Sequence, residues 1–303
     1  MVPQDAARFA HTAPGTPGLT VSNLSVAYGG VVAVRDVSLS VRPGEITAVL
    51  GANGAGKTTT LLGISGLVKA REGHIDFEGT SLLGLAPERI ARLGIAHVPA
   101  GRGIFPGLSV ADNLRMGLYG SGRDGETDGV EEVLDAFPIL RERRTQPAGT
   151  MSGGQQQQLA IGRALVQRPK LLMLDEMSMG LSPTVVADLF ALVRRLADDG
   201  MAVVMVEQFV GQALKVADQA VVIEQGTVAA AGKPSELTAE DIGAAYLGSA
   251  SEAKLPGAPA DARQQVPVSL AGVDVRKLQR LAEQQGRTVD ELAQELLEKA
   301  LHS

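Results

Sequence analysis

The residues whose types and spacing most directly indicate chemistry form the stretch GANGAGKTT at residues 51–59. It fits the pattern G-x-x-x-x-G-K-[ST] and lies between EITAVL, typical of a buried strand, and TLLGISGLV, typical of a helix. Such a loop turns its backbone N–H groups toward phosphate oxygens. The alternative is a plain glycine turn with a surface lysine, but such a turn does not require a strand before it and a helix after it. We expect Lys57 to reach the β- and γ-phosphates of a nucleotide and Thr58 to bind Mg²⁺. The other residues expected at the phosphates are Asn53, Gly54, Ala55, Gly56 and Thr59.

Two acidic residues end a second buried run, KLLMLDE at residues 170–176. An acid at the end of a buried strand, well downstream of a phosphate loop, suits a water-mediated Mg²⁺ ligand, and this acid is Asp175. The next acid, Glu176, can reach an attacking water, so we assign it as the general base, a role that contributes about 10²–10⁴-fold to a rate. Two carboxylates that only cap a strand in solvent are the alternative, which the phosphate loop disfavours.

A second candidate phosphate site is MSGGQ at residues 151–155. Ser152, Gly153 and Gly154 would offer a hydroxyl, free N–H groups and the positive end of a helix to an anion. Gln155 follows them in the first turn. Two phosphate sites in one chain are redundant unless the second serves the nucleotide of another molecule. A serine N-cap with flexible glycines explains the same residues without a ligand, and the sequence leaves both interpretations open.

The composition restricts the class of protein. The chain has 303 residues, 45% of them hydrophobic, which suits one large domain with an extra piece, or two domains. The net charge of −6 argues against nucleic acid and anionic lipid as partners. The absence of cysteine excludes disulfides, thiol catalysis and Cys–zinc sites. The apolar runs are too short to span a bilayer and the N-terminus does not resemble a signal peptide, so we expect a cytoplasmic protein.

Strands alternate with helices from residue 45 onward, which predicts an α/β fold with a mostly parallel sheet covered by helices. Upstream, residues 19–28 and 31–44 predict two strands joined by a Gly-Gly turn. A mainly helical excursion over about residues 107–168 predicts a subdomain, in which Ser109 is placed to start a helix.

GANGAGKTT, MSGGQ and LLMLDE, in this order and spacing, resemble the motifs of ABC-type ATPases, the nucleotide-binding subunits of ABC transporters. The resemblance covers about residues 19–250 and implies a P-loop fold with an antiparallel β subdomain, a mostly parallel core sheet and a helical subdomain. It also implies that two protomers face head-to-tail, with ATP and Mg²⁺ between the P-loop of one and residues 152–154 of the other. Tyr28 matches the aromatic residue that stacks on adenine; an exposed tyrosine at a strand end is the alternative.

Finer features are similar to one of the two ATPase subunits of branched-chain amino acid importers, and the ATPases of urea and amide importers share much of this pattern. These features are GRGIFPGLSVADNL, RERRTQPAGTMSGGQQQQLAIGRAL, VEQ after a predicted strand, and AAYLG at residues 244–248. The similarity implies a second ABC ATPase subunit in a hetero- or homodimer, two membrane permease subunits and an extracytoplasmic solute-binding protein. It also implies a peripheral position on the inner face of the membrane and a small polar, amino-acid-like solute.

Four positions depart from the family pattern. Gln208 stands where most ABC ATPases have histidine; its amide can donate to a γ-phosphate oxygen but cannot carry a proton, so we assign it a weakened catalytic role. Ala100 replaces a glutamine or glutamate and removes a polar ligand of Mg²⁺ or water. Met177 and Ser182 replace the usual proline and aspartate. We therefore expect slow basal ATP hydrolysis, with one site of a heterodimer more competent than the other.

The two ends of the chain differ from the middle in composition. Residues 1–18 predict a flexible tail and residues 251–265 a Pro- and Ala-rich linker. Residues 266–303 predict a short strand and two helices, the second with a capping box at Thr288 and Glu291. This resembles a ribbon-helix-helix module or a helical hairpin. Its balanced charges disfavour DNA binding, so we prefer a dimerisation element or a hairpin packed on the ATPase.

Two other functions remain open. One is a non-transport ABC ATPase of repair or translation, a class that usually carries large insertions or two ATPase units. The other is a weakly catalytic, ATP-binding regulatory or scaffold protein that acts through its C-terminal module, and the residues at positions 100 and 208 favour it.

Overall fold

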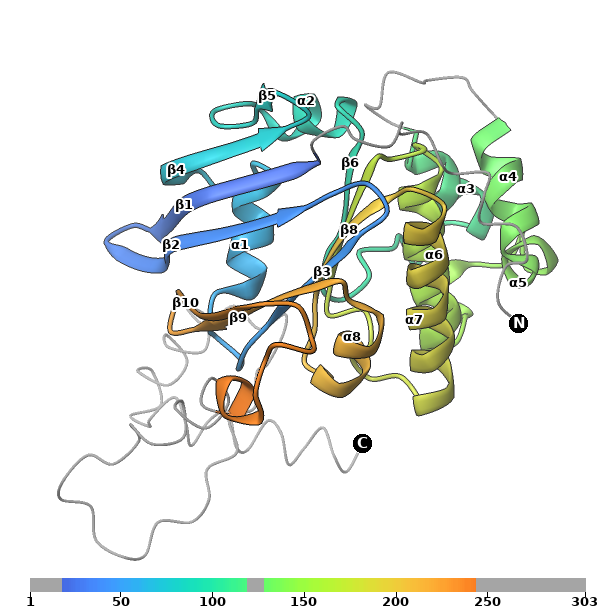
Figure 1. Cartoon of the computed structure of the whole chain (residues 1–303). Coiled ribbons are helices and arrows are strands. Elements are labelled where there is room, and N and C mark those ends of the chain that lie inside the picture. The colour runs from blue at the N-terminus through green and yellow to red at the C-terminus, as the bar shows by residue number, and fades with distance from the viewer. Residues whose placement is uncertain (1–17, 119–127, 244–303) are drawn as a thin grey trace, which may run out of the picture. The chain divides into compact units, whose positions relative to one another are not determined.

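The computed structural model describes residues 18–118 and 128–243, and Figure 1 shows how their helices and strands are arranged. The strands are β1 (Leu19–Tyr28), β2 (Val31–Val41), β3 (Ile46–Leu50), β4 (Ala70–Phe77), β5 (Thr80–Ser81), β6 (Ile95–Val98), β7 (Leu171–Asp175), β8 (Ala202–Val206), β9 (Gln219–Glu224) and β10 (Thr227–Gly232). The helices are α1 (Lys57–Ile64), α2 (Pro87–Arg92), α3 (Val110–Met116), α4 (Asp128–Ala136), α5 (Pro138–Glu142), α6 (Gly153–Leu165), α7 (Pro183–Asp198) and α8 (Val210–Val216), with a 3₁₀ turn at Ala148–Thr150. The predictions for the N-terminal tail, residues 244–248, the linker and the C-terminal module lie outside the described residues.

The strands form two sheets. One has four strands in the order β2-β1-β4-β5, and its neighbours run antiparallel. The other has six strands in the order β10-β9-β3-β8-β7-β6; β3, β6, β7, β8 and β9 run parallel and β10 runs antiparallel at one edge. This arrangement confirms the predicted α/β fold with an antiparallel part and a mostly parallel core sheet.

Both faces of the six-stranded sheet are covered. Leu172 and Leu174 of β7 belong to a buried cluster with α6 and α7, whereas Leu171 and Met173 belong to a cluster with α1 and the four-stranded sheet. Successive side chains of a strand point to opposite faces, so a strand covered on both sides needs an unbroken apolar run. Strands β3, β7 and β8 have five residues each, and all of these residues are therefore buried. Figure 1 shows α1 between the two sheets and α6 and α7 on the far face.

Local signals set several element ends as predicted. Ser109 caps α3, and its hydroxyl accepts a hydrogen bond from the backbone N–H of Asp112 at 3.1 Å. The first residues of β4, the two-residue strand β5 and helix α5 were not predicted. Residues 70–73 join β4 through pairing with β1, although their charged side chains face solvent. Helix α5 is five residues long, too short to show a helical period, and begins at a proline.

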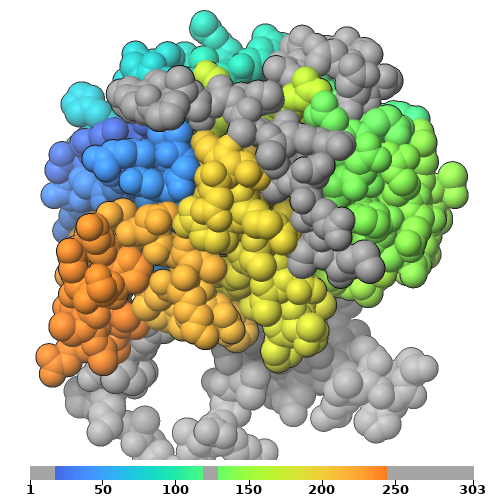
Figure 2. All heavy atoms as spheres, turned by 45° about the vertical axis from the view of Figure 1, so that its right-hand side comes forward, coloured from blue at the N-terminus to red at the C-terminus, as the bar shows by residue number. Residues whose placement is uncertain are grey.

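The helices after β6 gather on one side of the molecule. In Figure 2, α7 (yellow) lies between the strands β1 and β2 (blue) and the helices α4 and α5 (green). Among the helices that the structure describes, none combines the length and hydrophobicity required to cross a bilayer.

Candidate functional site

The loop between β3 and α1 follows a path that only glycine permits at two points. Gly51 has φ +149°, and a Cβ atom there would lie 2.1 Å from the carbonyl oxygen of Ile223 in the neighbouring strand β9. Gly54 has φ +79° and its missing side chain would face open space. The strand, glycine loop and helix predicted from residues 45–64 are therefore present, and the loop leaves room beside its backbone.

A cavity of about 170 Å³ lies at this loop. Its lining residues are Ala33, Gly54, Gly56, Lys57, Thr58, Thr59 and Glu176. The structure thus brings the predicted general base to the predicted phosphate loop, although the two are far apart in the sequence. Asn53 and Ala55 belong to the loop but do not line the cavity, and Ala55 is buried.

Lys57 places a cationic donor at the centre of the loop. Its side chain is buried, and its Nζ donates to the carbonyl oxygens of Gly51 and Ala52, both at 2.9 Å. Burial lowers the pKa of Lys57, while the nearby carboxylates of Glu176 and Asp175 oppose this effect. The lysine is therefore held among groups that a phosphate oxygen could replace as acceptors.

Thr58 and Asp175 meet beside Lys57. The Thr58 hydroxyl donates to Asp175 Oδ1 at 3.1 Å. Burial raises the pKa of Asp175, whereas the bonds from Thr58 and from the backbone of Ala100 act in the opposite direction. Hydroxyl and carboxylate oxygens are ligands of the type that Mg²⁺ takes together with water and phosphate. Within the described ranges no three His, Cys, Asp or Glu side chains are grouped as a metal site.

Glu176 and Gln208 form the third part of the site. Because β7 and β8 are neighbours, the loops that follow them meet at the same edge of the sheet. Gln208 Nε2 donates to Glu176 Oε1 at 2.8 Å, and the backbone N–H of Glu176 donates to the carbonyl of Val206 at 2.9 Å. Glu176 adopts φ +48°, which turns the chain sharply after the strand. The two residues assigned to catalysis thus lie in direct contact.

The residues of MSGGQ lie apart from this cavity. They form a capping box at the start of α6: Ser152 Oγ accepts from the backbone N–H of Gln155 at 3.4 Å, and Gln155 Oε1 accepts from that of Ser152 at 3.0 Å. Ser152, Gly154 and Gln155 line a different cavity, of about 360 Å³, together with residues of α5 and α7. The fold thus does not bring MSGGQ to its own phosphate loop. Tyr28, about half exposed at the end of β1, does not line the 170 Å³ cavity either.

Sequence reasoning did not identify a polar cavity of about 180 Å³ between β6, α3 and α6. His97, Met116 and Arg163 help to line it, and the Arg163 guanidinium lies 5.4 Å from the centre of the Phe105 ring. His97 Nε2 and one Arg163 nitrogen are buried without a hydrogen-bond partner among the described residues. Phe105 and Arg163 occur in stretches that the sequence analysis used only as subfamily features. The sequence contains both residues but does not show that they contact each other.

The burial of His97 makes protein stability depend on pH. Burial lowers its pKa from 6.5 to about 4, so below pH 6.5 the unfolded chain binds a proton more readily than the folded chain. We expect the wild type to lose up to about 3 kcal/mol relative to His97→Gln as the pH falls from 6.5 to 4. Urea unfolding of both proteins across this range measures the difference, and parallel pH curves would contradict it.

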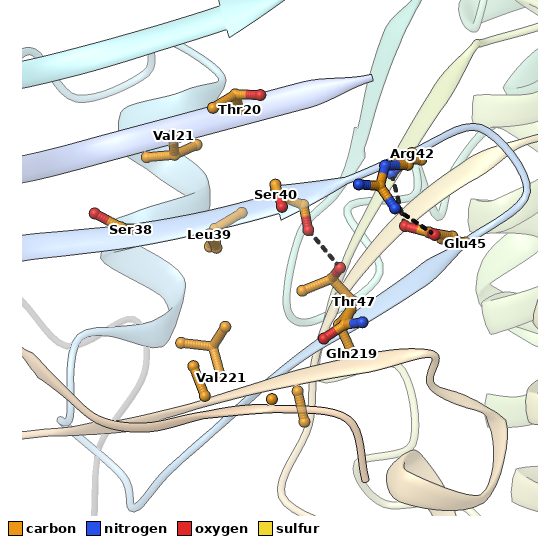
Figure 3. A pocket seen from close by; sticks show the side chains of 13 residues that line it. Thr20, Val21, Ser38, Leu39, Ser40, Arg42, Glu45, Thr47, Gln219 and Val221 are labelled. Atoms are coloured by element: carbon orange, nitrogen blue, oxygen red, sulfur yellow. Dashed lines mark hydrogen bonds and ion pairs between the residues drawn. The ribbon is translucent and has the colours of Figure 1, made fainter. Parts of the chain in front are cut away.

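A further groove lies outside the nucleotide site. It has a volume of about 460 Å³ and lies between β1 and β2 on one side and β9 and β10 on the other (Figure 3). Thr47 donates to the carbonyl of Ser40 at 2.7 Å there, and Arg42 forms an ion pair with Glu45 at 3.5 Å. It shares no residue with the cavity at the phosphate loop.

The glycine loop between β3 and α1, with an acid-ended strand beside it, defines an α/β nucleotide-binding protein of the P-loop class. The chain belongs to the ABC transporter ATPase family, whose model, described as ABC transporter, matches residues 34–179. BraG of Pseudomonas aeruginosa, a "high-affinity branched-chain amino acid transport ATP-binding protein", is 47% identical over 210 residues, 69% of this chain and 90% of BraG. The lipopolysaccharide export ATP-binding protein LptB of Escherichia coli K12 is 37% identical over 236 residues, 76% of this chain and 97% of LptB.

Solved structures agree with this family. The ADP conformation of MJ1267, an ATP-binding cassette of an ABC transporter, has a TM-score of 0.65 at 28% identity, over 75% of this chain and 94% of that one. The chain is therefore an ATP-binding subunit that hydrolyses ATP in transport. Cassettes of this family dimerise and act with membrane permease subunits.

Proposed function

We propose that this chain energises an importer of branched-chain amino acids or of a related small polar solute. The observation that carries the proposal is the 47% identity to BraG over 90% of that protein. LivF of Archaeoglobus fulgidus, a probable branched-chain amino acid transport ATP-binding protein, is 36% identical over 220 residues, 72% of this chain and 93% of LivF. LptB, at 37% identity, is less similar to this chain than BraG at 47%, so an export role is the second candidate.

The geometry supports a division of labour among five side chains. Lys57 and the loop N–H groups hold the phosphates, and Thr58 and Asp175 hold Mg²⁺, which supplies charge neutralisation when it is bound. Glu176 accepts the proton of the attacking water, and Gln208 orients Glu176 and donates toward the γ-phosphate. Because Gln208 cannot carry a proton, basal turnover is slow.

A neighbouring protomer completes the site in this proposal. Ser152, Gly153, Gly154 and Gln155 lie away from their own phosphate loop. The capping box does not use the N–H groups of Gly153 and Gly154, which suit the phosphates of a partner's ATP. Tyr28 is exposed enough to stack on adenine. The Gly154 backbone packs against Val185 of α7, and this contact holds the start of α6 in place.

We place the permease subunits on a docking surface formed by Phe105, Leu108, Met116 and Arg163. The three apolar side chains are 37–43% exposed, which is typical of an interaction site when such residues are grouped. The loop that carries Phe105 and Leu108 begins near Ala100, whose backbone N–H lowers the pKa of Asp175. A partner bound here would therefore contact a loop that begins beside the nucleotide site.

Solute uptake tests the function and the docking surface together. Proteoliposomes that contain this chain, the permease subunits of its transporter and their solute-binding protein should accumulate labelled leucine when ATP is enclosed. Phe105→Ala should reduce uptake at least about tenfold, as expected when an aromatic residue is removed from the centre of an interface. The control is Leu67→Ala, which removes another exposed apolar side chain far from this loop in the sequence.

The outcomes separate the alternatives. Uptake of urea in place of leucine would move the assignment to the urea and amide importers. Uptake that is insensitive to Phe105→Ala would remove the docking surface but not the transport function. No ATP-dependent uptake of any solute would favour the regulatory alternative.

A further inference from the structure

A buried carboxyl group that the reaction described above does not use lies directly behind the catalytic pair. Glu207 follows β8 and is 0% exposed. Both the hydroxyl and the backbone N–H of Ser178 donate to it, the latter at 3.3 Å, and the backbone N–H of Gln208 donates to it at 3.3 Å. Ser178 is 2% exposed. The pair is thus a buried contact between two loops, not a surface contact.

The two loops are the ones that carry the catalytic residues. Glu176 and Ser178 lie in the loop after β7, and Glu207 and Gln208 lie in the loop after β8. The loops are joined twice: Gln208 Nε2 bonds to Glu176 Oε1 at 2.8 Å, and Ser178 bonds to Glu207. The first bond involves Glu176, which lines the nucleotide cavity. The second joins two side chains that are shielded from solvent.

The loop after β7 also reaches the start of α6. Its later residues pack closely there: a Cβ atom on Gly153 would lie 3.3 Å from Leu181, and one on Gly154 would lie 2.7 Å from Val185 in α7. The segment that begins at the general base therefore ends against the corner assigned to a partner's ATP. Holding this segment at Ser178 fixes both ends of it.

We propose that Glu207 is a positioning residue for ATP hydrolysis: through Ser178 it holds the loops after β7 and β8 together, so that Glu176 and Gln208 stay in bonding distance. The proposal rests on the assignment of Glu176 as the general base. Glu207 does not line the cavity at the phosphate loop, and its side chain bonds to Ser178 and to the backbone of Gln208. Its charge also raises the pKa of Lys57.

The cost of burying this group supports a specific role. Burial raises the pKa of Glu207 to about 7, and the charge of Glu176 acts in the same direction, while the bonds from Ser178 and Gln208 oppose it. An ionisable group removed from water destabilises a fold unless its partners compensate. A leucine or methionine would fill this place at no such cost, so packing alone does not account for a glutamate here.

The test compares Ser178→Ala, Glu207→Gln and the double variant in the full-length chain. Each single variant should lower the kcat of ATP hydrolysis about tenfold, the factor expected for one hydrogen bond to a charged group, and leave the KM for ATP within about twofold. Glu207→Gln replaces one of the two oxygens that accept from Ser178 with an amide donor, and Ser178→Ala removes the hydroxyl that donates to one of them. Both changes weaken the same contact, so the double variant should be little worse than either single one. Glu88→Gln, the same chemical change on the exposed first turn of α2, is the matched control.

Each result decides the proposal. Unchanged kcat in both single variants, or additive losses in the double variant, would overturn it. A fall in kcat that equals the fall in the number of ATP-binding sites per chain would also overturn it. That result would mean only that a smaller fraction of the variant protein is folded. Glu176→Gln in the same assay keeps the two assignments separate: if it abolishes turnover while Ser178→Ala does not lower it, the general base stands and only the role of Glu207 fails.

Discussion

Replacing Glu176 with glutamine should lower the rate of ATP hydrolysis by about 10²–10⁴-fold while ATP still binds. The side chain of Glu176 lines the cavity at the phosphate loop and accepts a hydrogen bond from Gln208. An amide keeps the shape and can still accept that bond, but it cannot take a proton from water. Phosphate release under single-turnover conditions measures the loss. The unhydrolysed ATP should hold two protomers together, which size-exclusion chromatography with ATP detects.

The control for this variant is Glu88→Gln, because it makes the same chemical change on the exposed surface. Turnover that is unaffected by Glu176→Gln would contradict its role as the general base. If the variant also showed no ATP-dependent change in size, the regulatory or scaffold function would become the better interpretation.

Replacing Lys57 with alanine should weaken ATP binding at least about a hundredfold, since the variant loses a cationic donor to the phosphates. The lysine is buried, and its Nζ is held by the carbonyl oxygens of Gly51 and Ala52. Among the described residues that line the cavity at the phosphate loop, no other is a lysine or an arginine. Isothermal titration with ATP, or retention of labelled ATP on a filter, measures the change.

Lys69→Ala removes an exposed lysine shortly after α1 and should bind ATP like the parent. A circular dichroism melt shows whether Lys57→Ala remains folded. If a folded Lys57→Ala protein binds ATP as tightly as the parent, the phosphate loop is not the nucleotide site, and the assignments of Thr58 and Asp175 are lost with it.

Much of the fold could be predicted because its signals are local. A Gly-Gly pair between β-branched runs produced the β1–β2 hairpin, and an apolar run that ends in acids produced β7. The glycines at positions 51 and 54 have backbone angles that other residues avoid, so the sequence alone predicts the phosphate loop.

The rest depends on contacts between distant parts of the chain. Thr58 and Asp175 are brought together by the pairing order of the six-stranded sheet, which no local pattern contains. Glu207 was visible only as the middle letter of VEQ; its burial and its bond to Ser178 come from the loops that meet there. Arg163 and Phe105 likewise occur in two separate stretches that indicate the subfamily. They stack only because the fold places α6 beside the loop after β6.

The effect of position 100 on the pKa of Asp175 comes from the main chain, so a substitution there keeps it whatever the new side chain is. Among the natural amino acids only proline, which has no N–H, would delete the donor. Side chains at position 100 can therefore change what the loop offers to water, while its backbone continues to tune the carboxyl group of Asp175.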